Sequence, residues 1–180
     1  DLSYFLEGNA IVLQLLKTEI FNNKNIEFQL NVFAKRILNN LNFINLNLNS
    51  KIKDGLIDLD DTSFEWKNFV NLKITDSLLF VKDGELILDG RLNININDYN
   101  EVYKYLLTPK KFRKKIKTIN LNFSYNFDQK STSFSNIKVD GKFDQKLNQV
   151  MTGLSFKGSN LKNKIYLKNL LNDAIKSYFG

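Results

Sequence analysis

Residues 119–127 read INLNFSYNF, and no other stretch indicates the fold so clearly. Apolar side chains occupy every second position, and asparagine or serine fills the positions between them. Successive side chains of a strand point to opposite faces of its sheet, so this alternation predicts a strand with one apolar face and one polar face. The apolar parity comprises Ile119, Leu121, Phe123, Tyr125 and Phe127.

A second long strand is predicted over residues 86–97. Its apolar parity comprises Leu86, Leu88, Leu92, Ile94 and Ile96. Twelve extended residues reach about 40 Å at about 3.3 Å per residue, which is long for a strand. Gly90 interrupts the apolar parity, and we expect a bulge or a bend there.

Shorter alternating runs predict further strands. Their apolar positions are Phe28, Leu30 and Val32; Ile44, Leu46, Leu48 and Ile52; Val70, Leu72 and Ile74; and Ile137, Val139 and Phe143. Turn-forming residues at 53–55, 82–84 and 128–131 separate them. Because the strands follow one another without regular intervening helices, the sequence predicts an antiparallel meander.

Three helices are expected at the periphery. Asp98 and Glu101 form a capping-box pattern that begins a helix ending before Pro109. An amphipathic stripe predicts a C-terminal helix over residues 161–178, and a weaker stripe predicts one over residues 9–20. The C-terminal stripe consists of Leu167, Leu170, Leu171, Ala174, Ile175 and Tyr178, and the weaker stripe of Val12, Leu15, Leu16 and Ile20.

The predicted fold class is therefore α+β and β-dominated: a long, curved antiparallel sheet with one to three peripheral helices. One proline and eight scattered glycines leave no linker-like segment, so residues 1–180 are expected to form a single domain. The chain opens at Asp1 and its only methionine is Met151, which suggests a piece of a longer protein. The densest apolar stretch, residues 11–16, is far shorter than the roughly 18 to 20 residues that span a bilayer.

The composition excludes several kinds of chemistry. The chain has no cysteine and no histidine, which removes thiolate nucleophiles, Cys/His zinc sites and imidazole acid–base catalysis. The net charge is +7, but lysine supplies 23 of the 26 basic residues, asparagine occurs 26 times and alanine three times. An A/T-rich genome favours this composition, so the basic balance is weak evidence for nucleic-acid binding.

One basic segment contains most of the excess charge. Residues 110–117 carry six positive charges, from Lys110, Lys111, Arg113, Lys114, Lys115 and Lys117. Such a patch could contact anionic lipid head groups or, less plausibly without an aromatic RNA-binding motif, a nucleic-acid backbone. The alternative is a solvated connection whose Phe112 and Ile116 point inward, and this alternative is slightly favoured.

The acidic residues predict turns and caps. Asp58, Asp60 and Asp61 lie at one predicted strand end, and Asp140 and Asp144 flank Gly141. Their spacing does not match a calcium loop, and no serine has a base beside it in a plausible motif. The glycine turns match neither a Walker loop nor a dinucleotide fingerprint. We expect no enzyme activity, cofactor, metal or small-molecule substrate.

Two stretches resemble the AsmA-like family, which includes TamB and YhdP. Residues 48–60 read LNSKIKDGLIDLD and residues 78–97 read LLFVKDGELILDGRLNININ. In both, a glycine turn leads straight into an alternating strand, and the resemblance covers about residues 26–145. The basic segment around Phe112 and the C-terminal helix depart from the family pattern.

The resemblance implies a strongly curved open sheet, a β-taco, with an apolar concave face. It further implies a periplasmic protein anchored in the inner membrane, which supports outer-membrane biogenesis or phospholipid transport and has no catalytic residues. The candidate lipid groove comprises Leu88, Leu92, Ile94, Ile96, Ile119, Leu121, Phe123, Tyr125 and Phe127. The expected partners are phospholipid or a membrane surface, and other envelope proteins.

Two alternatives stay open. The first is a protein–protein module that uses its sheet edges and binds no lipid. The second, weaker alternative is a basic β-domain that binds nucleic acid. Alternation cannot decide whether the apolar face is an open groove or a sealed core, because both bury one face of the sheet.

Overall fold

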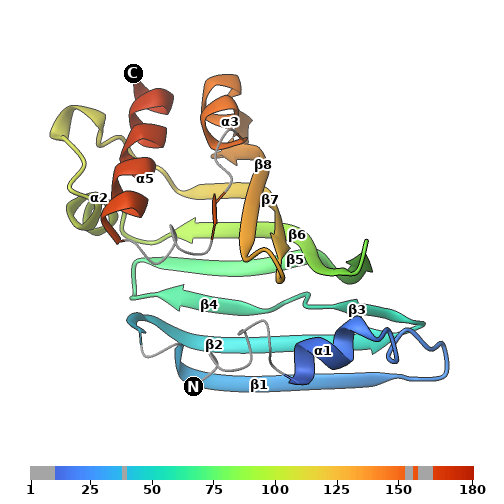
Figure 1. Cartoon of the computed structure of the whole chain (residues 1–180). Coiled ribbons are helices and arrows are strands. Elements are labelled where there is room, and N and C mark those ends of the chain that lie inside the picture. Colours follow the sequence, from blue (N-terminus) through green and yellow to red (C-terminus); the bar gives the residue numbers. More distant parts are fainter. Residues whose placement is uncertain (1–10, 38–39, 153–155, 158–163) are drawn as a thin grey trace.

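The computed structural model describes residues 11–37, 40–152, 156–157 and 164–180. Within these ranges the strands form one ten-stranded antiparallel sheet (Figure 1). The strands are β1 (Phe28–Ile37), β2 (Asn40–Lys53), β3 (Leu56–Asp58), β4 (Ser63–Trp66), β5 (Val70–Lys82), β6 (Glu85–Ile96), β7 (Thr118–Asn126), β8 (Ser131–Val139), β9 (Lys142–Phe143) and β10 (Phe156–Lys157). The helices are α1 (Ile11–Lys17), α2 (Tyr99–Leu106), the 3-10 turn η2 (Lys110–Phe112), α3 (Gln145–Thr152) and α5 (Lys164–Phe179).

The strand order follows the chain. Neighbouring strands run β1-β2-β3-β5-β6-β7-β8-β10, while β4 lies between β2 and β5 and β9 pairs with β8. Every pairing is antiparallel. The predicted meander and the β-dominated α+β class are therefore confirmed, and so is the unusual length of the strand predicted over residues 86–97.

Three Asp-Gly pairs make the tight hairpin turns. Asp54-Gly55, Asp83-Gly84 and Asp140-Gly141 have φ of 54° and 78°, 53° and 79°, and 48° and 78°, respectively. Positive φ at both central residues is the type I′ turn, whose twist matches that of the flanking strands. The predicted turns at 53–55 and 82–84 are confirmed. At residues 128–131, the Asn126 side chain supports the turn by accepting the N–H groups of Asp128 and Gln129.

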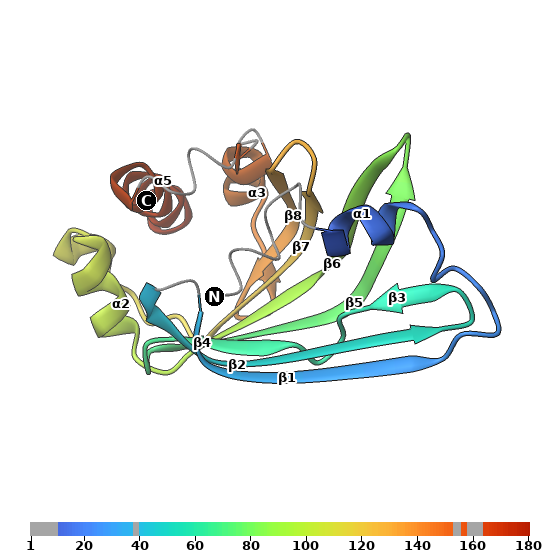
Figure 2. The same cartoon turned by 60° about the horizontal axis from the view of Figure 1, so that its bottom comes forward.

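Three bulges bend the long strands. Each bulge has an asparagine or aspartate with positive φ: Asn45 in β2, Asp76 in β5 and Asn136 in β8. The bulge expected at Gly90 lies instead in the facing strand β5, between Thr75 and Leu78. Bulges increase local twist and bend a strand. Figure 2 shows the result: the sheet curves, so that β5 and β6 rise away from the plane of β1 to β3 and enclose α1 on the concave side.

The bulge in β5 also changes which residues face the concave side. Before it, Leu72 and Ile74 pair with residues of the apolar parity in β6; after it, Leu79 pairs with Leu88 and Val81 with Leu86. The even parity becomes the odd parity because one extra residue is inserted. Residues 78–81 are all apolar and show no alternation. Because of the bulge, Leu79 and Val81 lie on the same face of the sheet as Leu72 and Ile74.

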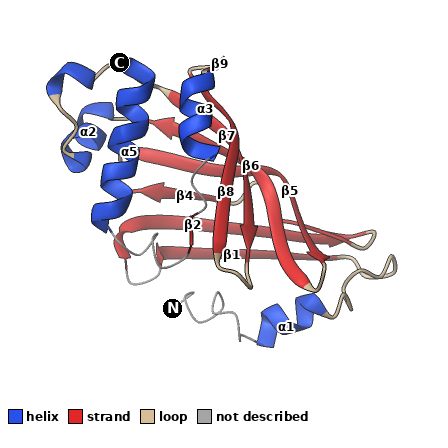
Figure 3. Ribbon diagram, turned by 45° about the horizontal axis from the view of Figure 1, so that its top comes forward, coloured by secondary structure: helices blue, strands red, loops and turns tan. Residues whose placement is uncertain are grey.

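Helices cover the concave face at two places. Leu13 of α1 packs in one cluster with Ile52, Ile57, Leu79, Leu86, Leu88 and Phe127. A second cluster joins α2, α3 and α5 to the far end of the sheet, and its buried members are Tyr103, Ile116, Leu121, Ile137, Val139, Leu147, Met151, Leu170 and Ala174. Figure 3 shows α3 and α5 together at the β7–β8 side of the sheet and α1 apart from them.

Two helix predictions and one strand prediction need correction. The first helix ends at Lys17, before the predicted end at Ile20, and buries Leu13, whereas Val12, Leu15 and Ile20 are exposed. Residues 9–10 of that prediction lie outside the described residues. Phe143 was expected on the apolar face of a strand, and this is wrong: it lies in the two-residue β9, but its side chain is exposed. Helix α3 was not predicted, since its buried Asn148 interrupts the apolar stripe.

The two remaining helices agree better with expectation. Asp98 caps α2 by accepting the Glu101 N–H at 3.1 Å, but the Glu101 side chain pairs with Lys104 and not with the cap. Helix α5 buries Leu170 and Ala174 of the predicted stripe. Residues 161–163 of that predicted helix lie outside the described residues, as does the Leu167 side chain.

Candidate lipid-facing surface

An unbroken row of apolar residues crosses the concave face of the sheet. The strand register places Phe28 beside Ile52, Ile52 beside Ile57, Ile57 beside Leu79, Leu79 beside Leu88 and Leu88 beside Tyr125. A second row runs through Phe64, Leu72, Ile94, Ile119 and Val139. Cross-strand neighbours lie about 5 Å apart, so each row is a continuous apolar band.

All nine predicted groove residues belong to this face, since they occupy alternate positions along β6 and β7, with Phe127 one residue beyond the end of β7. Leu88, Leu92 and Ile94 pair with Tyr125, Leu121 and Ile119, and Phe123 lies opposite Gly90. They differ in burial. Leu88, Leu121 and Phe127 are fully buried, and the other six are half-buried. Phe123 packs against both clusters and so connects the two helix-covered ends of the face.

The basic segment 110–117 begins where the apolar face ends. The Ile96 N–H, at the end of β6, donates to the Lys117 carbonyl at 2.8 Å. Ile116 is buried and Phe112 half-buried, as the inward orientation predicted for them requires. The five lysines of the segment are exposed, and Arg113 is half-buried, with Nε donating to the Thr108 carbonyl at 2.7 Å.

Most charges of this segment are not neutralised by carboxylates. In the part of the chain that the structure describes, none of its six basic side chains belongs to an ion pair. Lys114 instead donates to the Phe179 carbonyl at 3.3 Å and lies 5.1 Å from the centre of the Phe179 ring. Lys111 lies over the Phe112 ring. Apart from Lys117, which interacts with the Asp140 carboxylate, the lysines of the segment therefore present unpaired positive charge to solvent.

Buried hydrogen bonds hold the segment to the helices. The Tyr103 hydroxyl donates to the Lys114 carbonyl at 2.6 Å, and burial raises the pKa of Tyr103 to about 12. Thr108 is completely buried and donates to Asn172 Oδ1 at 2.5 Å, while Asn172 Nδ2 donates to the Leu106 carbonyl at 2.6 Å. The chain on both sides of Pro109 is thus fixed in place.

Between these anchors, Leu107 points away from the protein. It follows α2 directly, has φ 60° and ψ 34°, and is 75 % exposed. A leucine in the left-handed conformation is strained by roughly 1 kcal/mol or more, and glycine is the residue that usually ends a helix in this way. Leu107 stands three residues before Lys110, so an exposed apolar side chain adjoins the basic segment.

Sequence reasoning missed Leu107 as a site residue. It directly follows the apolar stripe of α2, and by position alone it looks like one more core residue. The available signal was the helix end itself: a helix that stops before Thr108-Pro109 commonly ends in a residue with positive φ, and leucine occupies that position here.

The acidic residues stabilise turns and bulges. Asp60 Oδ1 accepts both the N–H and the hydroxyl of Ser77 at 2.7 Å, next to the β5 bulge. Asp144 caps α3 by accepting the Leu147 N–H at 2.7 Å. Burial raises the pKa of Asp140, but the N–H groups of Thr118 and Lys117 outweigh it and lower the pKa overall. In the described ranges no group of acidic residues is arranged to hold a metal ion.

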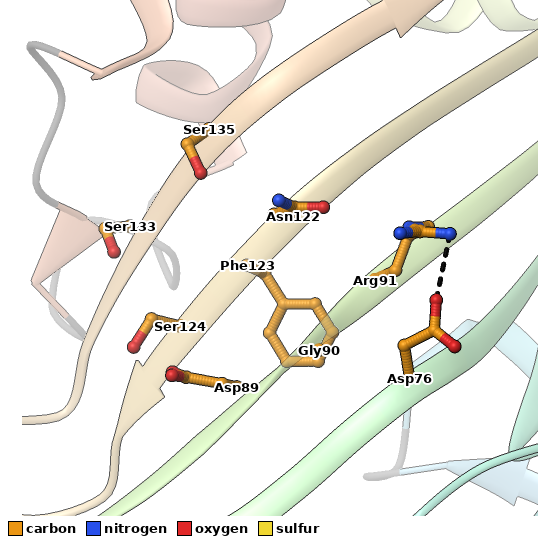
Figure 4. A pocket seen from close by; sticks show the side chains of 9 residues that line it. All are labelled: Asp76, Asp89, Gly90, Arg91, Asn122, Phe123, Ser124, Ser133 and Ser135. Carbon is orange, nitrogen blue, oxygen red and sulfur yellow. Dashed lines mark ion pairs between the residues drawn. The ribbon is translucent and has the colours of Figure 1, made fainter.

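A polar hollow of about 380 Å³ occupies the middle of β5 to β8 (Figure 4). Its side chains come mainly from the parity opposite to the apolar face: Asp76, Asp89, Arg91, Asn122, Ser124, Ser133 and Ser135, with Gly90 and Phe123 completing the lining. Arg91 Nη1 pairs with Asp76 Oδ2 at 2.9 Å. The hollow is therefore mainly hydrophilic, and Phe123 is the one residue of its lining that also belongs to the predicted groove.

Comparisons with protein-family models, with curated proteins and with solved structures find no match for this chain. Among the described residues, no helix has both the length and the apolar composition needed to cross a bilayer.

Proposed function

We propose that this chain is a non-catalytic, AsmA-like module of the bacterial envelope, which contacts a phospholipid surface and supports outer-membrane biogenesis or phospholipid transport. The parent protein would lie in the periplasm, anchored in the inner membrane. Support comes from the curved antiparallel sheet, from its continuous apolar concave face and from the basic segment at one end of that face.

The observation that carries the proposal is the strained, exposed Leu107 beside the basic segment. A side chain held out in solvent by a strained backbone, on a loop whose two flanks are anchored, indicates a function that offsets the strain. Apolar side chains that enter a bilayer next to lysines that contact anionic head groups form a common kind of membrane-surface contact. Lys110 and Lys111 stand within four residues of Leu107.

Vesicle binding tests the electrostatic half of this proposal. We expect the domain to co-sediment with vesicles that contain phosphatidylglycerol and not with vesicles of phosphatidylcholine alone. Each basic residue near such a surface contributes about 1 kcal/mol, so changing Lys111, Lys114 and Lys115 to glutamate should abolish binding. The matched control changes Lys24, Lys82 and Lys130, which are exposed beside other turns of the chain, and should weaken binding much less.

Leu107→Gly tests the apolar half, and it separates function from stability. Glycine relieves the left-handed strain, so the variant should be more stable than the native domain by about 1 kcal/mol in urea unfolding. Its vesicle binding should nevertheless fall, whereas Leu56→Gly, which removes an exposed leucine at the first position of β3, should leave binding unchanged. Equal vesicle binding by the native domain and Leu107→Gly, or no binding by the native domain, would contradict the proposal.

A further inference from the structure

Strand β1 forms one edge of the sheet. It pairs with β2 along Phe28 to Arg36 in a continuous register, and among the described residues it has no neighbour on its other side (Figures 1 and 3). An edge of this length presents a row of backbone N–H and C=O groups that can pair with another strand. Proteins usually protect such edges with proline, bulges or inward-pointing charges, and β1 has none of these from Phe28 to Ala34.

The side chains of β1 are unusually apolar for a free edge. Phe28 is 52 % exposed, Leu30 41 % and Phe33 66 %. Phe28 and Leu30 belong to the concave apolar face, because they pair with Ile52 and Ser50 of β2. The apolar face of the sheet thus reaches its edge without a polar border.

The sequence of β1 is complementary to itself in one antiparallel register. When Asn31 of one copy faces Asn31 of another, Leu30 faces Val32, Phe28 faces Ala34 and Glu27 faces Lys35. Opposed residues then have the same parity, so the apolar positions share the concave face in both copies. Residues of the same parity also direct their backbone N–H and C=O groups to the same edge of the strand, as pairing across a two-fold axis requires.

Charge selects this register over its neighbours. A shift of one residue in each copy places Val32 opposite itself, and Phe28 then faces Arg36 while Glu27 faces Ile37. The opposite shift places Leu30 opposite itself and Glu27 opposite Phe33. Only the register centred on Asn31 brings Glu27 to Lys35, twice by symmetry, and the two central asparagine amides can hydrogen-bond to each other. Among the residues that the structure describes, Glu27 has one ion pair, an exposed contact of 3.6 Å with Lys53.

We propose that the partner of this edge is a second copy of the chain, joined through β1 in the register centred on Asn31. The two sheets then become one, and the apolar concave face continues from one copy into the other. This inference is independent of lipid binding, since it rests on strand geometry and charge alone.

A charge exchange tests the proposal by sedimentation. The native domain should approach twice the 21.0 kDa mass of the chain as its concentration rises. Glu27→Lys and Lys35→Glu each place like charges opposite one another at two positions, and each should weaken association by about tenfold. The double variant restores both pairs and should recover the native association. Lys142→Glu, an exposed residue on β9, is the control with the same charge change.

Disulfide trapping then tests the register. The chain has no cysteine, and Asn31 is exposed. Two Asn31→Cys residues would face each other at about 5 Å and should oxidise rapidly to a covalent dimer. Two Gln29→Cys residues would stand four positions apart, roughly 13 Å, beyond disulfide reach. A monomeric native domain at millimolar concentration would overturn the proposal, as would equal trapping of the two variants.

Discussion

At the scale of single residues, polar side chains replace strand partners at two interruptions of the sheet. Asn148 of α3 accepts the Ile137 N–H at 2.7 Å and donates to the Ile137 carbonyl at 2.8 Å, next to the bulge in β8. Thr62 does the same for Asn49 of β2, in the gap between β3 and β4. Both side chains are buried. These contacts satisfy backbone groups that would otherwise be left unpaired in the interior.

We expect Asn148→Ala to lower the free energy of unfolding by about 3 kcal/mol. The substitution leaves a buried N–H and a buried C=O of Ile137 without a partner, and each such group costs about 1 to 3 kcal/mol. The measurement is urea unfolding monitored by circular dichroism. Gln149→Ala, at the exposed neighbouring position of α3, controls for helix propensity and should change the stability by less than about 0.5 kcal/mol.

At the scale of elements, Gly90 fits the bulge of the facing strand. A Cβ atom at Gly90 would lie 3.0 Å from Cε1 and 3.1 Å from Cζ of Phe123, and 3.2 Å from Cβ of Ser77. Phe123 therefore occupies the space above the glycine, opposite the bulge that contains Ser77. The Phe123 ring thereby covers the backbone of Gly90, which would otherwise be exposed to solvent on the apolar face.

Gly90→Ala should therefore destabilise the domain, by about 1 to 3 kcal/mol, although alanine is the better strand former. Phe123→Leu replaces the ring that the new methyl group would contact with a shorter side chain. The double variant should consequently be more stable than the sum of the two single effects predicts, and a double-mutant cycle measures this coupling. Strictly additive effects would show that the Phe123 ring does not set the requirement for glycine.

The sequence predicted those elements whose signal is local. Strand β7 alternates throughout, β6 alternates except at Gly90, and the Asp-Gly turns have their own conformational signature, so these elements were predictable. The bulges were not, because the extra residue at Asp76 is defined only by the register with β6. The strand after Gly55 was expected from residues 48–60, and it is present as β3. The short strand β4 was missed for a related reason: four residues are too few to show a period.

The candidate site was predictable to a similar degree. Alternation placed the nine groove residues on one face, as the structure has them, but could not show which of them the helices cover. Coverage depends on contacts between residues far apart in the chain, such as Leu121 with Leu170 in one cluster. The basic segment was visible from composition alone, whereas Leu107 required the geometry of the helix end.

At the scale of the whole molecule, one apolar face of the sheet contributes residues to two clusters, each covered by helices. The cluster beneath α1 and the cluster beneath α3 and α5 share Phe123, and the half-buried residues lie around and between them. Lys17 of α1 forms an ion pair with Asp128, which lowers the pKa of Asp128 and ties α1 to the turn between β7 and β8. The sheet is thus closed by helices at separate places along its length.

Ile94→Asp distinguishes a covered face from an open one. Ile94 packs against the cluster of α3 and α5, so a carboxylate there would be buried without a partner and should lower the free energy of unfolding by about 3 kcal/mol or more. Leu56→Asp, at an exposed leucine, should change it by less than about 0.5 kcal/mol. Thermal melting of both variants, with native mass spectrometry for co-purified phospholipid, gives the answer. A stable Ile94→Asp variant that loses a phospholipid carried by the native domain would show instead that this part of the face is an open, lipid-filled channel.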